Sequence, residues 1–495
     1  MRKPNLIIPL ATSYNQRGVQ AATNATNAID QRKINAIYEV DRNAITSSLS
    51  FHLTKRPGVT DVGTNYGSSS SNVPYLILNN NLADIGGEVA GAYVTNGGTI
   101  YAASSGGINF TICGVTATGA LPLFADITNI SGVPVSLVQI GTSAFIQQQR
   151  VFYNDGAEKE ITDGDFPASS ASGKMEFMDG FAFIMSQGWP GKIFNSDLNS
   201  LANWTAANFI SRGIKQDYGV ALARYKNIIL GFGSLSVEAF YNAGNASGSP
   251  LSPVKHLQAD IGISMSTAMG VSNYYCLIDD MMYFVGKKDE SIWKSLFKFN
   301  GSSFVEVSNP SLSKMLTEST IYSLNAVNIF GKKGLNIRTT PVTDATQKSL
   351  VYFPQWNDWF EWNSTKFFVA NDARYFLGLS ANSKGQRLYK FISTDNWQDD
   401  GASYQFATQF KLPGGGPDRK RMEEFGVIGD TKAANTLTVE VSDDDYGTFT
   451  TKATLDLSTA RKSTTRGGTY IDRVIRLSNT NALETRLQSF TALVK

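Results

Sequence analysis

One acidic run near the C-terminus has the clearest spacing for chemistry: Ser442-Asp443-Asp444-Asp445-Tyr446-Gly447-Thr448-Phe449. It approximates the hairpin motif Ser-x-Asp-x-Gly-x-Thr-aromatic, with one residue out of step. In such a turn a carboxylate accepts hydrogen bonds from backbone amides, which is a structural role. Three carboxylates could also bind calcium, but the spacing of an EF-hand and its terminal Glu are missing. We therefore expect a hydrogen-bonded turn and no metal.

A second group of carboxylates, Glu238 with Asp279 and Asp280, could form a glycosidase pair. Glu238 falls in an alternating, strand-like run, and the two aspartates precede a strand as turn residues do. Nothing nearby completes an active site, so a carbohydrate-binding or carbohydrate-active β-propeller is the alternative function. Its sugar platforms would be tryptophans, although these lie in or beside hydrophobic runs, as core residues do: Trp189, Trp204, Trp293, Trp356, Trp359, Trp362 and Trp397.

The remaining reactive residue types are sparse. Two histidines, His52 and His256, cannot build a multi-histidine zinc centre, and neither lies in a recognisable nucleophile motif. Two cysteines, Cys113 and Cys276, form no disulfide framework and are expected to be small buried hydrophobes. No phosphate-binding loop or dinucleotide motif occurs. We expect no enzyme, no cofactor, no metal and no small-molecule substrate.

Two short basic runs are the candidates for assembly contacts. The net charge of +2 implies no bulk attraction to nucleic acid. Solvated loop charge is the default for both runs, and contact with an acidic partner subunit or with DNA phosphate is the functional alternative. The candidates are Lys55, Arg56, Pro57 and Gly58 in the first run, and Arg419, Lys420 and Arg421 in the second.

The elements that position these residues are predicted to be β-strands. Charged residues make up only 17%, while Gly (44), Tyr (20) and Phe (29) are abundant. From 74 to 400, aromatic and β-branched runs alternate with Asn-Gly and Asp-Gly turns. A degenerate unit begins near Phe181, Ile228, Met281, Val327 and Arg374. Its spacing of roughly 45 to 55 residues is typical of propeller blades, and a chain of unrelated β-sandwiches is the alternative.

The ends of the chain differ from this all-β, propeller-like core. Residues 1–73 are predicted to be an N-terminal arm and linker, in which Ala21–Ser48 lacks Gly and Pro and is expected to contain a helix. Residues 401–495 are predicted to be a β-sandwich-like module, although Arg473 interrupts the alternation of one strand. No stretch reaches the length of a membrane-spanning helix, so we expect no membrane anchor.

Several segments resemble one protein family. Phe194–Trp204 with Ala206–Phe209, and Leu230–Gly244 with Ser249–Leu251, resemble the packaged-DNA stabilisation proteins that form the tail nozzle (tail hub) of short-tailed phages. Lys55–Gly58 is similar to the Arg-Pro-Gly that follows the first strand of that family. Val441–Asp444 is similar to part of the family's final β-module. Residues 63–175 carry no motif of the family.

The resemblance implies a structural protein of the virion tail, made in the host cytoplasm. It implies a homo-hexameric ring at the distal end of the portal–adaptor channel, which retains packaged DNA and opens for ejection. Its partners would be the portal-adaptor ring, tail fibres or spikes, and genomic DNA that passes without tight binding. From exposure and composition, we expect the N-terminal arm to dock to the adaptor and the loop around Pro413–Arg421 to contact a neighbouring subunit.

Overall fold

The computed structural model describes much of the chain in detail. The described residues are 6–10, 32–40, 51–61, 89–94, 100–104, 109–115, 123–128, 136–140, 143–147, 151–154, 158–167, 171–186, 190–264, 274–288, 291–341, 348–363, 375–379, 386–391, 397–412, 418–444, 446–460 and 462–495. The chain forms two compact units. Unit 1 contains residues 1–60, 348–364 and 391–495, and unit 2 contains 61–347 and 365–390. The three-part division by sequence (1–73, 74–400, 401–495) stays a prediction.

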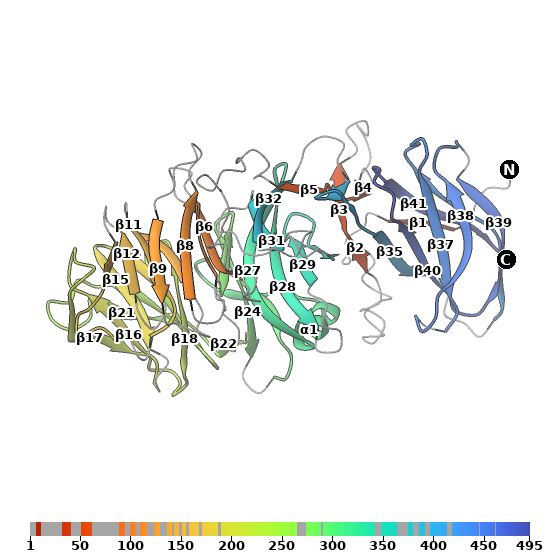
Figure 1. The fold of residues 1–495 in the computed structure, drawn as a ribbon. Coiled ribbons are helices and arrows are strands. Elements are labelled where there is room, and N and C mark those ends of the chain that lie inside the picture. Colours follow the sequence, from red (N-terminus) through yellow and green to blue (C-terminus); the bar gives the residue numbers. More distant parts are fainter. Residues whose placement is uncertain are drawn as a thin grey trace. The chain divides into compact units, whose positions relative to one another are not determined.

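Unit 2 is built from consecutive antiparallel sheets, each formed by strands that follow one another in the sequence (Figure 1). The first four sheets have four strands each, in sequence order. The first sheet contains β6 (Val89–Val94), β7 (Ile100–Ser104), β8 (Asn109–Val115) and β9 (Leu123–Thr128), and the second contains β10 (Ser136–Ile140), β11 (Ser143–Gln147), β12 (Val151–Asn154) and β13 (Glu158–Glu160). The third contains β14 (Ala171–Met178), β15 (Phe181–Ser186), β16 (Lys192–Ser196) and β17 (Trp204–Ser211), and the fourth contains β18 (Gly219–Tyr225), β19 (Ile228–Gly233), β20 (Val237–Asn242) and β21 (Leu251–Ala259).

The fifth sheet of unit 2 has five strands, and two hairpins and a helix follow it. These elements are β22 (Ile261–Ile263), β23 (Tyr275–Ile278), β24 (Met281–Lys288), β25 (Ser295–Phe299) and β26 (Phe304–Glu306); α1 (Pro310–Thr317); β27 (Ser319–Ile329) with β28 (Lys332–Pro341); and β31 (Tyr375–Leu379) with β32 (Gln386–Phe391). Three of the five repeat starts predicted from the sequence, Phe181, Ile228 and Met281, are the first residues of β15, β19 and β24, which are second strands of their hairpins. The predicted start at Val327 falls inside β27, and the one at Arg374 lies outside the described residues.

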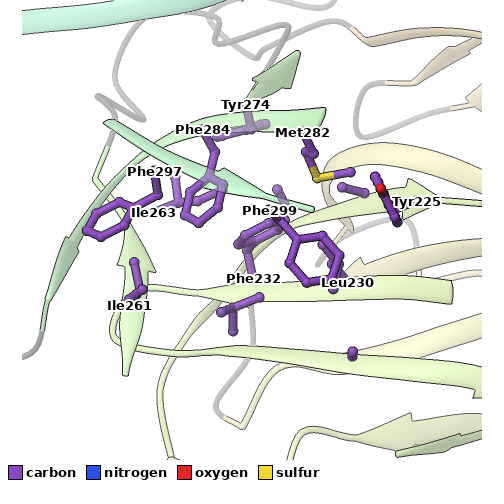
Figure 2. Packing of buried hydrophobic residues seen from close by; sticks show 14 of the residues in the cluster. Tyr225, Leu230, Phe232, Ile261, Ile263, Tyr274, Met282, Phe284, Phe297 and Phe299 are labelled. Atoms are coloured by element: carbon purple, nitrogen blue, oxygen red, sulfur yellow. The ribbon is translucent and has the colours of Figure 1, made fainter. Parts of the chain in front are cut away.

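Consecutive sheets of unit 2 pack face to face. Phe183 of β15 and Ile229 of β19 belong to one buried cluster, which joins the third sheet to the fourth. Phe232 of β19 and Phe284 of β24 belong to another, which joins the fourth to the fifth, with ring centroids 4.9 Å apart (Figure 2). Neighbouring residues of a strand point to opposite faces of its sheet. Since a cluster covers each face of the fourth sheet, nearly every residue of β19 is buried. Face-to-face sheets in sequence order are the blades of a β-propeller, as predicted.

Unit 1 contains two sheets that form a sandwich. In one, β3 (Ala36–Val40), β4 (Phe51–Lys55), β41 (Arg486–Val494), β36 (Lys420–Gly429) and β39 (Ser463–Tyr470) lie in that order, and β1 (Leu6–Pro9) also pairs with β41. In the other, β29 (Lys348–Phe353), β30 (Asp358–Trp362), β2 (Lys33–Ile34), β35 (Phe406–Lys411), β40 (Val474–Asn479), β37 (Thr436–Ser442) and β38 (Thr450–Asp456) lie in that order. Phe410 packs against Phe490 across the sandwich, with ring centroids 5.3 Å apart.

The prediction of a helix within Ala21–Ser48 is wrong for the part that the structure describes. Residues 33–34 and 36–40 are strands β2 and β3. Asn35, between them, has a φ of 50°, which interrupts any helix, and Ala36–Val40 pairs along its length with β4. Pairing with a strand outweighs the weak helical propensity of this segment. The rest of Ala21–Ser48 lies outside the described residues. Within the described residues, no helical segment has the length and apolarity that a membrane crossing requires.

Candidate functional site

The first basic run lies in the interior of unit 1. Lys55 ends β4, and Lys55 and Arg56 are both 0% exposed. The Arg56 guanidinium donates from Nη1 to Asp399 Oδ1 at 2.8 Å and from Nη2 to Asp399 Oδ2, and its Cζ lies 4.0 Å from the Tyr404 ring centroid. Asn35 Oδ1 accepts from its Nε at 3.2 Å. The expectation of solvated loop charge is therefore wrong for this run, because its partners come from distant segments.

Lys55 is buried, and no carboxylate of the described residues forms a hydrogen bond with it. Its Nζ donates to the carbonyl of Asn481 at 2.6 Å and lies 4.4 Å from the Tyr404 ring centroid. Burial, and then the positive charge of Arg56, lower the pKa of Lys55 to about 8. A cation in this place is costly to keep charged.

Gly58, the last residue of the run, lies directly against the backbone of Gln398. Residues 59–61 form β5 (Val59–Asp61), which pairs in parallel at Val59 with Asp399 of β33 (Gln398–Asp399), and β33 in turn pairs with β34 (Ala402–Ser403). A Cβ at position 58 would lie 2.0 Å from the carbonyl oxygen of Gln398, so only glycine fits. Lys55–Gly58 thus fastens the N-terminal strands to the segment at 398–404.

The second basic run lies at the surface of unit 1. Arg419 and Arg421 are exposed and Lys420 is half-buried, at the start of β36. The backbone of Arg421 exchanges two hydrogen bonds with Lys495, so the run is fixed in a sheet while its side chains point outward. The preceding residues 413–417 lie outside the described residues. This run keeps the exposure that an assembly contact requires, and that role stays a prediction.

The acidic run forms the predicted turn. Asp444 Oδ1 accepts from the Ser442 hydroxyl at 2.6 Å and from the Thr448 amide at 2.8 Å, and Oδ2 accepts from the Thr448 hydroxyl at 2.6 Å. The hydrogen bonds from the Ser442 and Thr448 side chains hold the pKa of Asp444 far below its usual range, and the bond from the Thr448 amide adds a smaller effect. Asp445 lies outside the described residues. Among those described, no group of three His, Cys, Asp or Glu residues is arranged to hold a metal ion.

Asp443 has a different partner, which the sequence analysis missed. It forms a bidentate ion pair with Arg473, with both N–O distances at 2.6 Å. Arg473 is almost fully buried, stacks 4.5 Å from the Tyr470 ring centroid and donates to the carbonyl of Gly467. The break in alternation at Arg473, directly before β40, was the visible signal: a buried arginine requires a partner that accepts its hydrogen bonds.

The carboxylates of the alternative function are not assembled as a glycosidase pair. Glu238 is buried on β20, and its two oxygens accept from the amides of Gly213 and Ile214 at 3.0 Å each. Asp279 and Asp280 occupy the β23–β24 turn with positive φ, and Asp279 pairs with Lys333 at the surface. Of the candidate sugar platforms, Trp204 and Trp362 are buried, as core residues are. Trp356, Trp359 and Trp397 are half-buried, Trp293 is exposed, and Trp189 lies outside the described residues.

Glu238 belongs to a buried ionic network in unit 2. Arg212 Nη1 lies 2.8 Å from Asp217 Oδ1, and its Nε lies 3.9 Å from Glu238 Oε1. Asp217 Oδ2 accepts from the amides of Leu235 and Ser236. The network ties the link between the third and fourth sheets to the β19–β20 turn. The signal for this network in the sequence is the Gly-x-Gly-Ser-x-Ser-x-Glu spacing at 231–238, which lies within the segment that resembles the phage family.

The other reactive residues have ordinary places. His52 is buried on β4, and His256 is exposed on β21. Cys276 is buried, as expected for a small hydrophobe, and the side chain of Cys113 lies outside the described residues.

Comparisons with known proteins give distant structural likenesses. BamB from Moraxella catarrhalis shares 11% identity over 62% of this chain and 84% of its own, with a TM-score of 0.35. A putative 6-phosphogluconolactonase from Bacteroides uniformis shares 12% identity over 67% of this chain and 95% of its own, with a TM-score of 0.37. Likenesses this distant carry no argument about function. No curated protein matches the sequence.

One family model matches more than half of the chain, from residue 52 to residue 330. Its description is Bacteriophage P22 Gp10, beta-propeller, and the matched range holds the face-to-face sheets of unit 2. It also holds most of the segments on which the resemblance rested, including Lys55–Gly58 and Leu230–Gly244. This chain belongs to that family, the phage tail nozzle and stabilisation proteins.

Proposed function

We propose that this chain is a non-catalytic structural subunit of a phage tail nozzle. Six copies form a ring at the distal end of the portal–adaptor channel, retain packaged DNA and open for its ejection. The observation that carries the proposal is the family match over residues 52–330. As a tail component, the chain is made in the host cytoplasm and ends in the virion.

The packing of unit 2 supports a ring-forming subunit. Each of its described inter-sheet cores is filled with large apolar side chains, so the consecutive sheets act as one stiff body. A stiff body whose two flanks differ closes into a ring when the rotation between copies divides a full circle. The propeller is therefore suited to be the repeating wedge of such a ring.

The charge of the chain supports a passage for DNA without a grip on it. Each phosphate contact made by a Lys or Arg adds to the affinity for DNA and would slow ejection. The net charge is only +2. In the first basic run, moreover, both cations are directed inward, so they add nothing to the surface charge.

Partners of the nozzle subunit would bind at exposed side chains. The portal-adaptor ring, tail fibres or spikes, and a neighbouring copy would use surfaces such as the one around Arg419 and Arg421, which are exposed. Lys55 and Arg56 would support assembly only indirectly, by fastening the N-terminal strands inside unit 1.

The test is the mass of the purified chain in solution, alone and with a candidate adaptor ring, by light scattering and native mass spectrometry. A hexamer, or a monomer that assembles to six copies on the adaptor, is the expected result. A monomer that ignores the adaptor and binds a glycan instead would overturn the nozzle proposal in favour of the carbohydrate propeller.

A further inference from the structure

The outermost strand of the third sheet, β17, has a sequence that favours pairing with other chains. Its eight residues, Trp-Thr-Ala-Ala-Asn-Phe-Ile-Ser, include no charge, no Pro and no Gly, and Thr205 to Ala207 are exposed. An exposed edge strand of this kind is a template for another strand. The outer strand of the fourth sheet, β21, carries Pro253 and Lys255, and β26 has only three residues. Among these three outer strands, β17 alone combines eight residues with no charge and no Pro, although its pairing with β16 is irregular between Trp204 and Phe209.

Two carboxylates occupy backbone amides of β17. The amide of Trp204 donates to Asp163 Oδ2 at 3.0 Å, and the amide of Ala206 donates to Asp165 Oδ2 at 3.1 Å. β17 is the last strand of its sheet, and amides two residues apart point to the same edge of a strand. Carbonyl oxygens of an added strand would take up such donors. The carboxylates thus stand where the oxygens of a further strand would be.

The segment that carries both carboxylates is anchored beside β17. Phe166 packs edge-on against Trp204 with ring centroids 4.9 Å apart, and Ile161 and Phe166 are buried in the same cluster as Trp204. Asp163 also accepts from the amide of Asp165 at 2.9 Å through its other oxygen. The hydrogen bonds from Asp165 and Trp204 lower the pKa of Asp163, so it remains an ionised acceptor at neutral pH.

We propose that Asp163 and Asp165 guard the edge of β17 against pairing with β17 of a second copy of this chain. The guard would prevent antiparallel association of two blades through their edges, and would leave assembly to other surfaces. The proposal is independent of the nozzle function, since any use of this propeller would require that its blades do not pair.

The test uses the full chain with Asp163→Ala/Asp165→Ala. Amides 204 and 206 should exchange hydrogen roughly fivefold faster or more, the factor expected for the loss of one hydrogen bond each. Sedimentation velocity should show concentration-dependent association beyond the wild-type state. Asp165→Asn is the matched control for Asp165→Ala: both remove one charge, but asparagine keeps a carbonyl acceptor for the amide of Ala206, so it should behave as wild type. Asp197→Ala is a second control, because within the described part of the chain the Asp197 carboxylate accepts from two side chains of the same strand, Thr205 and Asn208, and from no backbone amide.

Two results would overturn the guard. One is an alanine variant with wild-type exchange and sedimentation. The other is equal association of Asp165→Ala and Asp165→Asn, which would assign the effect to lost charge repulsion. If the double variant fails to fold, Asp165→Ala alone should still speed exchange at Ala206 without disturbing the contacts of Asp163.

Discussion

Arg56 and Asp399, which are 343 positions apart in the sequence, form a buried bidentate ion pair. The pair joins the connection between β4 and β5 to strand β33 within unit 1. Tyr404 completes it, because its ring stacks on the guanidinium and its hydroxyl donates to the carbonyl of Arg56. A planar, forked cation is needed to make all these contacts together, so lysine cannot replace arginine here.

Breaking this pair should destabilise unit 1 strongly. Asp399→Asn or Arg56→Met should lower the free energy of unfolding by about 3–5 kcal/mol, because the remaining partner stays buried without its counter-charge. Urea unfolding followed by tryptophan fluorescence measures this, since Trp362 lies 5.8 Å from the guanidinium. Glu423→Gln is the control: its ion pair with Lys495 is exposed and should change stability by less than about 1 kcal/mol. Equal losses in both variants would contradict the prediction.

Gly58→Ala should prevent unit 1 from closing correctly. The added Cβ would meet the carbonyl oxygen of Gln398 at 2.0 Å, and neither backbone can move without breaking the pairing of β5 with β33. We expect a loss of about 3 kcal/mol or more, or insoluble protein. Gly213→Ala is the matched control, because a Cβ there meets nothing within 4 Å. Thermal melting and soluble yield compare the two variants. A Gly58→Ala protein with the melting temperature of wild type would contradict the predicted clash.

Contacts between residues close together in the sequence were largely predictable, and contacts between residues far apart were not. The Asp444 turn was predictable, because all its partners lie within four residues. The blades were predictable from repeated hairpins. The burial of Lys55 and Arg56 was not, because Lys-Arg-Pro-Gly reads as a solvated turn and Asp399 lies far along the chain. The strand at Ala36–Val40 was mistaken for a helix for a different reason, since its pairing with the next strand, β4, outweighs its weak helical propensity.

Lys55 should make the stability of unit 1 depend on pH in the alkaline range. Its folded pKa of about 8 lies below the unfolded value of about 10.4, so between these values the unfolded chain binds more protons. Stability attributable to this group should therefore rise from about pH 8 to about pH 10.4. Lys55→Met should lack this rise and should be more stable than wild type at pH 7 by about 1–3 kcal/mol. Urea titrations across this range measure both effects.

The exposed Lys495 supplies the control for that experiment, since Lys495→Met removes one amine without removing a buried charge. It should leave the alkaline rise intact. If Lys55→Met keeps the same slope as wild type, another group causes the pH dependence and the assignment to Lys55 is wrong.

Arg419→Ala/Arg421→Ala tests the surface of unit 1 that the nozzle proposal uses. Both side chains are exposed, so stability should change by no more than about 0.5 kcal/mol. Ring formation, or binding to an adaptor ring, should weaken and lose part of its dependence on salt. Lys255→Ala/Lys452→Ala removes the same charge from exposed strands and should have a smaller effect. Equal effects would mean that net charge, and not this surface, governs assembly.

Glu238→Gln separates a structural carboxylate from a catalytic one. Both carboxylate oxygens of Glu238 accept from backbone amides, and glutamine would present an NH2 group to one of these donors. The mismatch is buried, so the free energy of unfolding should fall by about 2–3 kcal/mol. Asp280→Asn should change it by less than about 0.5 kcal/mol, because the residue is exposed in a turn whose positive φ asparagine tolerates. A glycosidase predicts the reverse: both variants fold normally and both lose activity on a glycan. Urea unfolding together with a glycan hydrolysis assay therefore decides between the two functions from the same pair of proteins.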